Sequence, residues 1–321
     1  MADTRRAVRE WAQTGDNPSD GLYLVALSGG GDSLALAWAA AQELPKLGLQ
    51  VGAVIVDHQL QADSADVAAR AAHTAQRWGL SPVMTKVVQV AGGEGPEDSA
   101  RQARYGAFSE ALKETGALGV LLAHTEDDQA ETVLLGLARG SGPGSLKGMA
   151  RTDGVYHRPL LGLRRDVLRS ALSDAGEDWW EDPHNSDPRF ARVRVRTEIL
   201  PLIESALGPG ITEALARSAE LFRNDSAVLD ELAHKLFVSV SSEHTPGHWS
   251  APVSALADQP EALRSRVLRQ LIISAGAPSP SFQHIREVSA LVTDWKGQSE
   301  VSVAGARVGR EGTAIHARIV S

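Results

Sequence analysis

The sequence predicts an α/β protein with a doubly wound parallel sheet, followed by a smaller, mainly helical or α+β domain at the C-terminal end. Over the first half of the chain, short apolar runs alternate with amphipathic stretches, which is the βαβ pattern of an open parallel sheet. Later the pattern changes to long helical periodicity and then to short mixed elements. The 321 residues are enough for two domains. We place the boundary in the glycine-rich turn after Leu207, which gives domains of residues 1–207 and 208–321.

The elements of the first domain follow from residue types and periodicity. Short runs rich in β-branched and aliphatic residues predict strands, and the amphipathic stretches between them predict helices. The expected order is strand 22–27, helix 33–44, strand 51–57, helix 64–78, strand 82–90, helix 98–115, strand 120–123 and helix 127–138.

The rest of the chain departs from this alternation. Residues 140–148 are so rich in glycine that we expect an irregular loop there. Leucines at helical spacing give residues 211–240 an apolar face, which predicts a long helix. The other expected elements are a strand at 155–159, a helix at 192–207, helices at 261–275 and 282–293, and short strands after Gln298.

The composition excludes several kinds of chemistry. The chain has no cysteine, which removes disulfides, thiolate zinc sites, iron–sulfur clusters and cysteine-based sulfur transfer. No apolar run approaches the roughly 18–20 residues that span a bilayer, so we expect no membrane partner and a cytoplasmic location. The net charge of −8 argues against a nucleic-acid partner when taken alone. Residues 139–196, however, carry 11 basic and 8 acidic side chains, which is a local basic excess.

A glycine-rich loop lies between the first expected strand and the first expected helix. Its glycines allow positive φ and a close approach of the backbone to a ligand, and the free N–H groups of a helix start attract anions. A carboxylate among such donors would repel phosphates unless it holds a hard cation such as Mg²⁺. The loop is neither a Walker loop nor a dinucleotide fingerprint, because both glycine spacings fail. It therefore predicts a metal–polyphosphate site made of Ser28, Gly29, Gly30, Gly31, Asp32 and Ser33.

A second polar cluster follows the strand expected at 120–123. His124 ends this strand, and Asp128 and Glu131 lie three residues apart, on one face of the next helix. An imidazole and two carboxylates at one corner can form a metal site, an acid–base site or a cation-binding site. A zinc-protease motif is absent. Asp127 is expected only to cap the start of the helix.

The short motifs, taken in order, resemble a known family. Residues 28–33 are similar to the SGGxDS loop of the N-type ATP pyrophosphatases, the PP-loop family. Residues 124–132 resemble the H-x-x-D-D-Q-A-E-T motif of the tRNA(Ile)-lysidine synthases within that family. Further segments that resemble this group are 56–60, 103–108, 158–161 and 181–187, which are similar to its V-D/H-H-G-L, A-R-Y-x-x-F, R-P-L-L and E-D-x-x-N-x-D stretches. The resemblance covers residues 22–201.

The resemblance implies an ATP-dependent ligase that modifies tRNA. In that family ATP adenylates the 2-oxo group of the wobble cytidine in an isoleucine tRNA with a CAU anticodon. Free L-lysine then attacks through its side-chain amine and displaces AMP, which changes decoding from methionine to isoleucine. The implied cofactors are ATP and Mg²⁺, the implied partners are the tRNA and lysine, and a homodimer is one assembly open to the chain.

The roles of single residues are carried over by position. The resemblance implies catalytic roles for Asp32, Arg104, His124, Asp128 and Glu131; ATP contacts for Ser28, Gly29, Gly30, Gly31, Asp32, Ser33, Val56 and His58; magnesium binding for Asp32; and lysine binding for Asp128 and Glu131. A basic stretch is the best candidate for tRNA phosphate contact, although a solvated basic helix face is the alternative; it contains Arg189, Arg192, Arg194 and Arg196. Trp179 and Trp180 are expected in the core.

Two departures and two rival functions stay open. Gln59 stands where the family usually has glycine, and Val193 stands where it often has asparagine. Gly31, at the variable position, should make the loop looser. Another PP-loop synthetase would share the loop but not the later motifs, and a thiolase would need cysteine. A non-catalytic nucleotide- or RNA-binding module is the rival from another class, and pyrophosphate release separates it from an enzyme.

Overall fold

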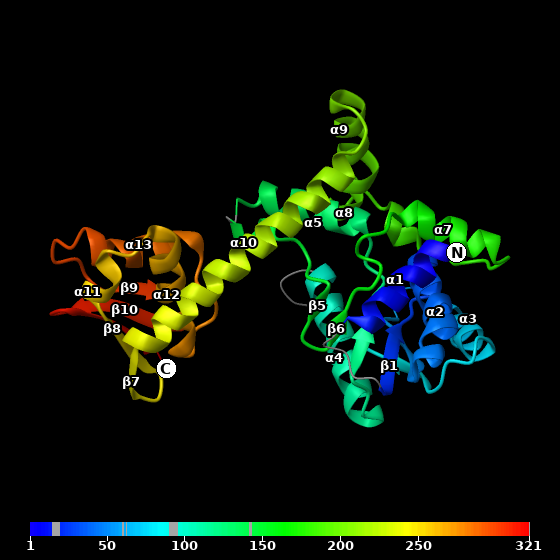
Figure 1. The fold of residues 1–321 in the computed structure, drawn as a ribbon, viewed down its shortest axis with the longest axis horizontal. Coiled ribbons are helices and arrows are strands. Elements are labelled where there is room, and N and C mark those ends of the chain that lie inside the picture. The colour runs from blue at the N-terminus through cyan, green and yellow to red at the C-terminus, as the bar shows by residue number, and fades with distance from the viewer. Residues whose placement is uncertain (15–19, 60, 62, 90–95, 141–142, 321) are drawn as a thin grey trace. The chain divides into compact units, whose positions relative to one another are not determined.

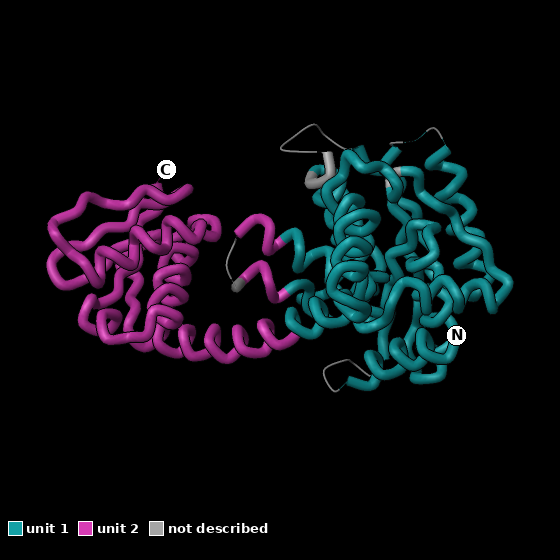
Figure 2. The backbone as a smooth tube through the Cα atoms, turned by 90° about the horizontal axis from the view of Figure 1, so that it is seen from above, with its two compact units in different colours: residues 1–135, 148–219 teal, residues 136–147, 220–321 magenta. Residues whose placement is uncertain are grey.

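The structure is a computed structural model that describes residues 1–14, 20–59, 61, 63–89, 96–140 and 143–320. These residues form two compact units, shown in different colours in Figure 2. The first unit contains residues 1–135 and 148–219, and the second contains residues 136–147 and 220–321. The division at 207/208 that the sequence suggests stays a prediction.

A six-stranded sheet forms the centre of the first unit (Figure 1). Its strand order is β3-β2-β1-β4-β6-β5; all neighbours pair in parallel except β5, which runs antiparallel to β6 at the edge. This confirms the predicted doubly wound parallel sheet, in which ligands bind where the strand order reverses. The strands are β1 (Gly21–Ala26), β2 (Leu49–Asp57), β3 (Val83–Val87), β4 (Gly119–Leu121), β5 (Thr152–Asp153) and β6 (Tyr156–His157).

Helices cover both faces of this sheet because successive residues of each strand point to opposite sides. In β1, Tyr23 and Val25 belong to the core beneath α1, α2, α3 and α7, whereas Leu24 belongs to the core beneath α4. Neither α1 nor α7 was predicted from the sequence. The helices are α1 (Ala2–Gln13), α2 (Gly31–Glu43), η1 (Pro45–Leu47), α3 (Ser64–Arg77), α4 (Pro96–Thr115), α5 (Glu126–Ala138) and α7 (Arg165–Asp174).

The helix expected at 192–207 is divided in the structure. A π-helical segment, η3, separates α8 from α9. Pro201 has no N–H and cannot donate to the carbonyl four residues earlier, so a regular α-helical ladder cannot continue through this point. These elements are η2 (Pro183–Ser186), α8 (Ala191–Arg194), η3 (Val195–Ile199), α9 (Leu200–Leu207) and α10 (Ile211–Val240).

The expectation that residues 140–148 are wholly irregular was wrong. Pro143–Leu146 forms one short helix, α6, in the second unit, and proline is well suited to a first helical turn because its missing N–H would be unpaired there. Residues 141 and 142 lie outside the described part of the chain.

The second unit has an antiparallel sheet with the order β7-β8-β11-β10-β9. Its core packs one face of this sheet against helices α11, α12 and α13 and against the last part of α10, including Phe237. The elements are β7 (Ser242–Thr245), β8 (His248–Pro252), α11 (Val253–Ala257), α12 (Glu261–Ser274), α13 (Phe282–Thr293), β9 (Val301–Val303), β10 (Ala306–Glu311) and β11 (Ala314–Ile319). The β7–β8 hairpin and α11 had not been predicted.

Among the described residues, no single helix has both the length and the apolar character needed to cross a membrane. One bent pair of helices, 191–207 with 211–240, meets that test on length and composition alone.

Candidate active site

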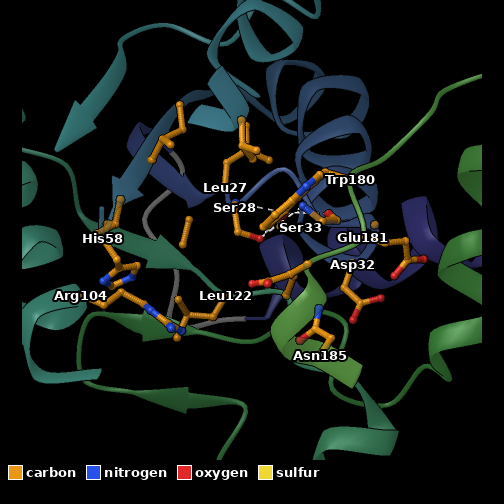
Figure 3. Close-up of a pocket in the computed structure, with 18 of the residues that line it drawn as sticks. Leu27, Ser28, Asp32, Ser33, His58, Arg104, Leu122, Trp180, Glu181 and Asn185 are labelled. Carbon is orange, nitrogen blue, oxygen red and sulfur yellow. Dashed lines mark hydrogen bonds between the residues drawn. The ribbon is translucent and has the colours of Figure 1, made fainter. Parts of the chain in front are cut away.

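A pocket of about 810 Å³ opens at the carboxyl ends of β1, β2 and β4 (Figure 3). This is the edge at which doubly wound sheets bind ligands. Its lining includes residues from the motifs at 28–33, 56–60, 103–108, 124–132 and 181–187, all in the first unit, but none from the segment 158–161. From the glycine loop come Ser28, Gly30, Gly31, Asp32 and Ser33; from the other motifs come Val56, His58, Arg104, His124, Asp128, Asp182 and Asn185.

The glycine loop is shaped by its two serines. Ser33 Oγ accepts from the Ser28 backbone N–H at 3.1 Å and donates to the Gly30 carbonyl at 2.8 Å. Gly29 has a φ of +83°, which favours glycine over other residues. No side chain among the described residues caps the start of α2, so its first N–H groups are available to an anion. The loop therefore has the geometry of a phosphate-binding turn.

Gly31 is needed for close packing beside this loop. A Cβ on Gly31 would lie 3.3 Å from the Trp179 ring, so a larger residue would push the indole away. The Trp180 N–H donates to the Gly29 carbonyl at 3.1 Å. Trp180 lines the pocket and both tryptophans are only partly buried, so the expectation of a core position was wrong for Trp180.

Asp32 has the features of a cation ligand. Its Oδ2 accepts from Arg165 Nε at 2.9 Å, whereas its buried Oδ1 has no hydrogen-bond partner among the described residues. Burial raises the pKa of the Asp32 carboxyl, and the nearby Asp128 raises it further, against the opposing effect of Arg165. A buried carboxylate oxygen without a partner is costly unless a cation reaches it. Asp32 therefore fits the hard, oxygen-liganded Mg²⁺ that the loop predicts.

His58 and Arg104 lie together at the other side of the pocket (Figure 3). Burial and the Arg104 charge lower the pKa of the His58 imidazole, so this ring is neutral near pH 7. Arg104 pairs with no carboxylate in the part of the chain that is described, and desolvation at the pocket lowers the pKa of its guanidinium. Gln59 next to His58 has a φ of +53°, a conformation that glycine adopts without strain.

Asp128 is fixed by a capping box at the start of α5. Its Oδ2 accepts from the Thr125 N–H at 2.8 Å, and its own N–H donates to Thr125 Oγ1 at 3.3 Å. Asp127 was expected to cap its own helix, but instead its Oδ2 accepts from the Arg165 N–H at 2.8 Å, at the start of α7. The two aspartates therefore hold α5 and α7 in a fixed relation.

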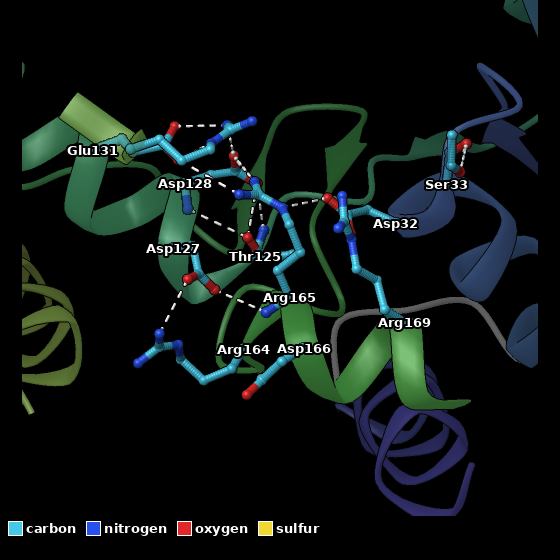
Figure 4. A network of polar contacts seen from close by, with 12 residues as sticks. Asp32, Ser33, Thr125, Asp127, Asp128, Glu131, Arg164, Arg165, Asp166 and Arg169 are labelled. Atoms are coloured by element: carbon cyan, nitrogen blue, oxygen red, sulfur yellow. Dashed lines mark hydrogen bonds and ion pairs between the residues drawn. The ribbon is translucent and has the colours of Figure 1, made fainter. Parts of the chain in front are cut away.

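Arg165, which the sequence analysis missed, connects the two halves of the site (Figure 4). Its guanidinium contacts Asp32 at 2.9 Å, Asp128 at 2.7 Å and Glu131 at 3.6 Å. Burial would raise the pKa of Asp128, but the Arg165 charge, assisted by the Thr125 N–H and Arg196, keeps it below its usual range. Arg165 is 133 residues from Asp32 in sequence, so no local pattern predicts this contact.

Glu131 is fully buried against two arginines of the basic stretch. Arg196 donates to Glu131 at 2.6 and 3.0 Å, and Arg192 Nε lies 3.7 Å from the same carboxylate. Burial raises the pKa of Glu131 in spite of Arg196. Arg192 and Arg196 thus face the site, and Val193 between them is buried.

The other two arginines of the basic stretch lie at the surface. Arg189 pairs with Asp187 at 2.6 Å, and Arg194 donates to the Pro188 carbonyl at 2.6 Å. The structure therefore does not bring the four arginines together on one free face, and their role in tRNA binding stays a prediction.

His124 is a neutral imidazole at the junction of β4 and α5. Burial is the main cause that lowers its pKa to about 4, against the opposing charge of Asp128. Its Nδ1 is buried and has no hydrogen-bond partner among the residues described. A neutral ring with an unused nitrogen can accept or donate a hydrogen bond to a ligand.

Comparisons with known proteins agree with this geometry. A family model described as a PP-loop domain matches residues 4–203, and one described as a TilS substrate binding domain matches residues 252–315. A tRNA(Ile)-lysidine synthase of Leifsonia xyli subsp. xyli is 50% identical over 290 residues, covering 90% of this chain and 87% of that protein. One of Thermobifida fusca is 47% identical over 312 residues, covering 97% and 94%.

A solved structure shares the fold. The U34-tRNA thiolase NcsA of Methanococcus maripaludis, with its 4Fe-4S cluster, superposes with a TM-score of 0.57 over 69% of this chain and 79% of its own, at 18% identity. The fold and the site define a PP-loop enzyme that uses ATP. Within that class, the chain belongs to the tRNA(Ile)-lysidine synthase family.

Proposed function

We propose that this chain joins free L-lysine to C2 of the wobble cytidine in an isoleucine tRNA with a CAU anticodon. In the first step the cytidine 2-oxo oxygen attacks the α-phosphorus of ATP, and pyrophosphate leaves. In the second step the lysine side-chain nitrogen attacks C2, the C2–O bond breaks, AMP leaves with that oxygen, and the nitrogen loses its protons. The observation that carries the proposal is one pocket that holds the glycine loop, Asp32 and Asp128 together, with Glu131 buried behind its lining residues Arg165 and Arg196.

In the ATP step, the loop N–H groups at the start of α2 would bind the pyrophosphate end. Asp32, through its unpartnered Oδ1, would hold Mg²⁺, which offsets negative charge on the departing group. The free guanidinium of Arg104 would bind phosphate or the activated base oxygen bidentately. The neutral His124 would donate or accept one hydrogen bond at the same centre and carry no charge of its own.

In the lysine step, Asp128 and Glu131 would bind the ammonium group and accept its protons. Both carboxylates already have guanidinium partners, because Arg165 and Arg196 contact them. The lysine ammonium group must therefore compete with Arg165 for Asp128, or bind beside these guanidinium groups as a further cation. With Arg192, which lies 3.7 Å from Glu131, three arginines face the three carboxylates Asp32, Asp128 and Glu131, so the lysine ammonium would replace a guanidinium contact.

Arg189 and Arg194, the surface arginines of the basic stretch, would contact phosphates of the tRNA. The affinity for tRNA should therefore fall as the salt concentration is raised. The homodimer is likewise a proposal, and light scattering of the purified full chain tests it.

The roles are separated by isosteric variants of the full chain. We expect Asp128→Asn and Glu131→Gln to raise the lysine concentration needed for half-maximal rate by about tenfold or more, because a buried charge contact is lost. The ATP concentration for half-maximal pyrophosphate release should change much less. Asp174→Asn, exposed on α7, is the matched control and should leave both unchanged. Wild-type lysine dependence in both site variants would refute the lysine-binding role.

A further inference from the structure

Three histidines gather on the second unit, far from any residue of the pocket in sequence. His244 lies on β7, His248 on β8 and His316 on β11, three adjacent strands of the antiparallel sheet. Trp249 and Ala251 of β8 point into the core of this unit. Since side chains alternate along a strand, His248 projects from the opposite face. The three imidazoles therefore share the face of the sheet that the helices do not cover.

The ring nitrogens converge within this cluster. One nitrogen from each histidine lies within 4.8 Å of the others, and His248 Nε2 is 3.0 Å from His316 Nδ1. A tetrahedral metal with nitrogen ligands at about 2.0–2.1 Å holds those nitrogens roughly 3.3 Å apart. Small side-chain rotations would bring the observed separations to that value. The histidine triad, as we call His244, His248 and His316, thus already has nearly the size of a metal site.

The surroundings suit a divalent transition metal. His248 and His316 are half-buried side chains whose ring nitrogens already contact each other, and imidazole nitrogens are common ligands of such ions. The Glu311 carboxylate lies 4.0 Å from His316 Nε2 and is held by Arg318 at 2.6 Å. It stands where a carboxylate can orient a ligating imidazole or complete the coordination. Three nitrogens without any thiolate fit Zn²⁺ or a similar borderline ion better than Mg²⁺ or Ca²⁺.

We propose that the histidine triad binds one zinc ion, with the fourth position open to water or to Glu311. The ion ties the short edge strand β7 to β8 and β11. All four residues of β7 are exposed, and its pairing with β8 shifts register between Glu243 and Thr245. A strand with so little burial is the least stable part of this sheet, and a metal bond across it stabilises the folded unit.

The test uses the full chain without an affinity tag, stripped of metal by a chelator and kept in excess Mg²⁺. Calorimetric titration with Zn²⁺ should give one ion per chain, and Co²⁺ should give the visible absorption of a four-coordinate site. Zn²⁺ should also raise the melting temperature. His316→Ala and His244→Ala should each weaken binding at least about tenfold and abolish the thermal shift, since each removes one of three ligands.

The control is His234→Ala, an exposed histidine of the same unit on α10, which should bind Zn²⁺ as the wild type does. His244 is exposed, so its loss should leave the near-ultraviolet circular dichroism unchanged and separate a ligand effect from misfolding. Absence of stoichiometric Zn²⁺ binding would overturn the proposal. Binding that survives in both triad variants would place the ion elsewhere and overturn it equally.

Discussion

Replacing Arg165 by methionine tests whether this guanidinium holds the two halves of the active site together. Methionine keeps an unbranched chain of similar length but removes the charge. In the wild type, this charge lies 2.7 Å from Asp128, 2.9 Å from Asp32 and 3.6 Å from Glu131. The variant leaves those largely buried carboxylates with one cationic partner fewer.

The expected loss follows from burial and distance. The exposed fractions of the side chains are 14% for Arg165, 25% for Asp32, 10% for Asp128 and 0% for Glu131. Two unit charges about 4 Å apart attract by about 4 kcal/mol at an effective dielectric constant near 20. Removing one partner of a buried ion pair costs about 3–5 kcal/mol, and we expect that loss in the free energy of unfolding at pH 8.

The dependence on pH identifies the cause. In the wild type the pKa of Asp128 is lowered, so its stabilising effect is present above the unfolded pKa and is lost as pH falls through the folded pKa. In the variant the uncompensated carboxylates take up protons at higher pH. The difference between the two proteins should therefore shrink from pH 8 to pH 5.

Denaturant unfolding followed by tryptophan fluorescence measures both quantities. Arg169→Met is the matched control on the same helix, because Arg169 and Glu181 are 46% and 57% exposed and should contribute about 0–1 kcal/mol. A loss for Arg165→Met no larger than that of the control, or one that does not change with pH, would refute this account of the site.

The remaining predictions concern three other residues. Asp32→Asn should reduce pyrophosphate release by about a hundredfold or more while tRNA binding persists, because the cation ligand is lost; a filter-binding assay checks the second point, and activity near wild type would contradict the role. Gln59→Gly should be at least as stable as the wild type, whereas Gln59→Val should lose about 1–2 kcal/mol in thermal unfolding, since φ is +53° there; equal stability of both would count against strain. His124 has a pKa of about 4 when folded and about 6.5 when unfolded, so the wild type loses stability as pH falls through that window. The free energy of unfolding of His124→Gln should fall less over the same pH window. Identical pH profiles of the two proteins would show that burial does not hold the His124 ring neutral.

Much of the first unit was predictable because strand and helix periods alternate so regularly. The glycine loop and the His124 corner were placed correctly at the carboxyl ends of β1 and β4, where parallel strands direct their following loops. The capping box of Thr125 and Asp128 could also be predicted from the sequence, because the two residues have the required spacing of three. Asp127, which the sequence favoured for this cap, instead binds the N–H at the start of α7.

The remaining features depend on contacts between distant segments. Arg165 reaches Asp32 only because the sheet and α7 bring them together across 133 residues. Arg196 turns toward the site because the fully buried Glu131 requires a charged partner. Helical spacing alone places Arg192 and Arg196 on one side, but it cannot say whether that side faces solvent. Trp180 lines the pocket for a similar reason, since its N–H is fixed by the Gly29 carbonyl.

The central claim is that this chain attaches lysine to one particular tRNA at the expense of ATP. The most direct measurement incubates the purified full chain with ATP, Mg²⁺, labelled lysine and an in vitro transcribed isoleucine tRNA with a CAU anticodon. A methionine tRNA with the same anticodon is the control. The account predicts one lysine incorporated per AMP released, with the isoleucine tRNA alone. Pyrophosphate release without lysine incorporation, or equal labelling of both tRNAs, would contradict it.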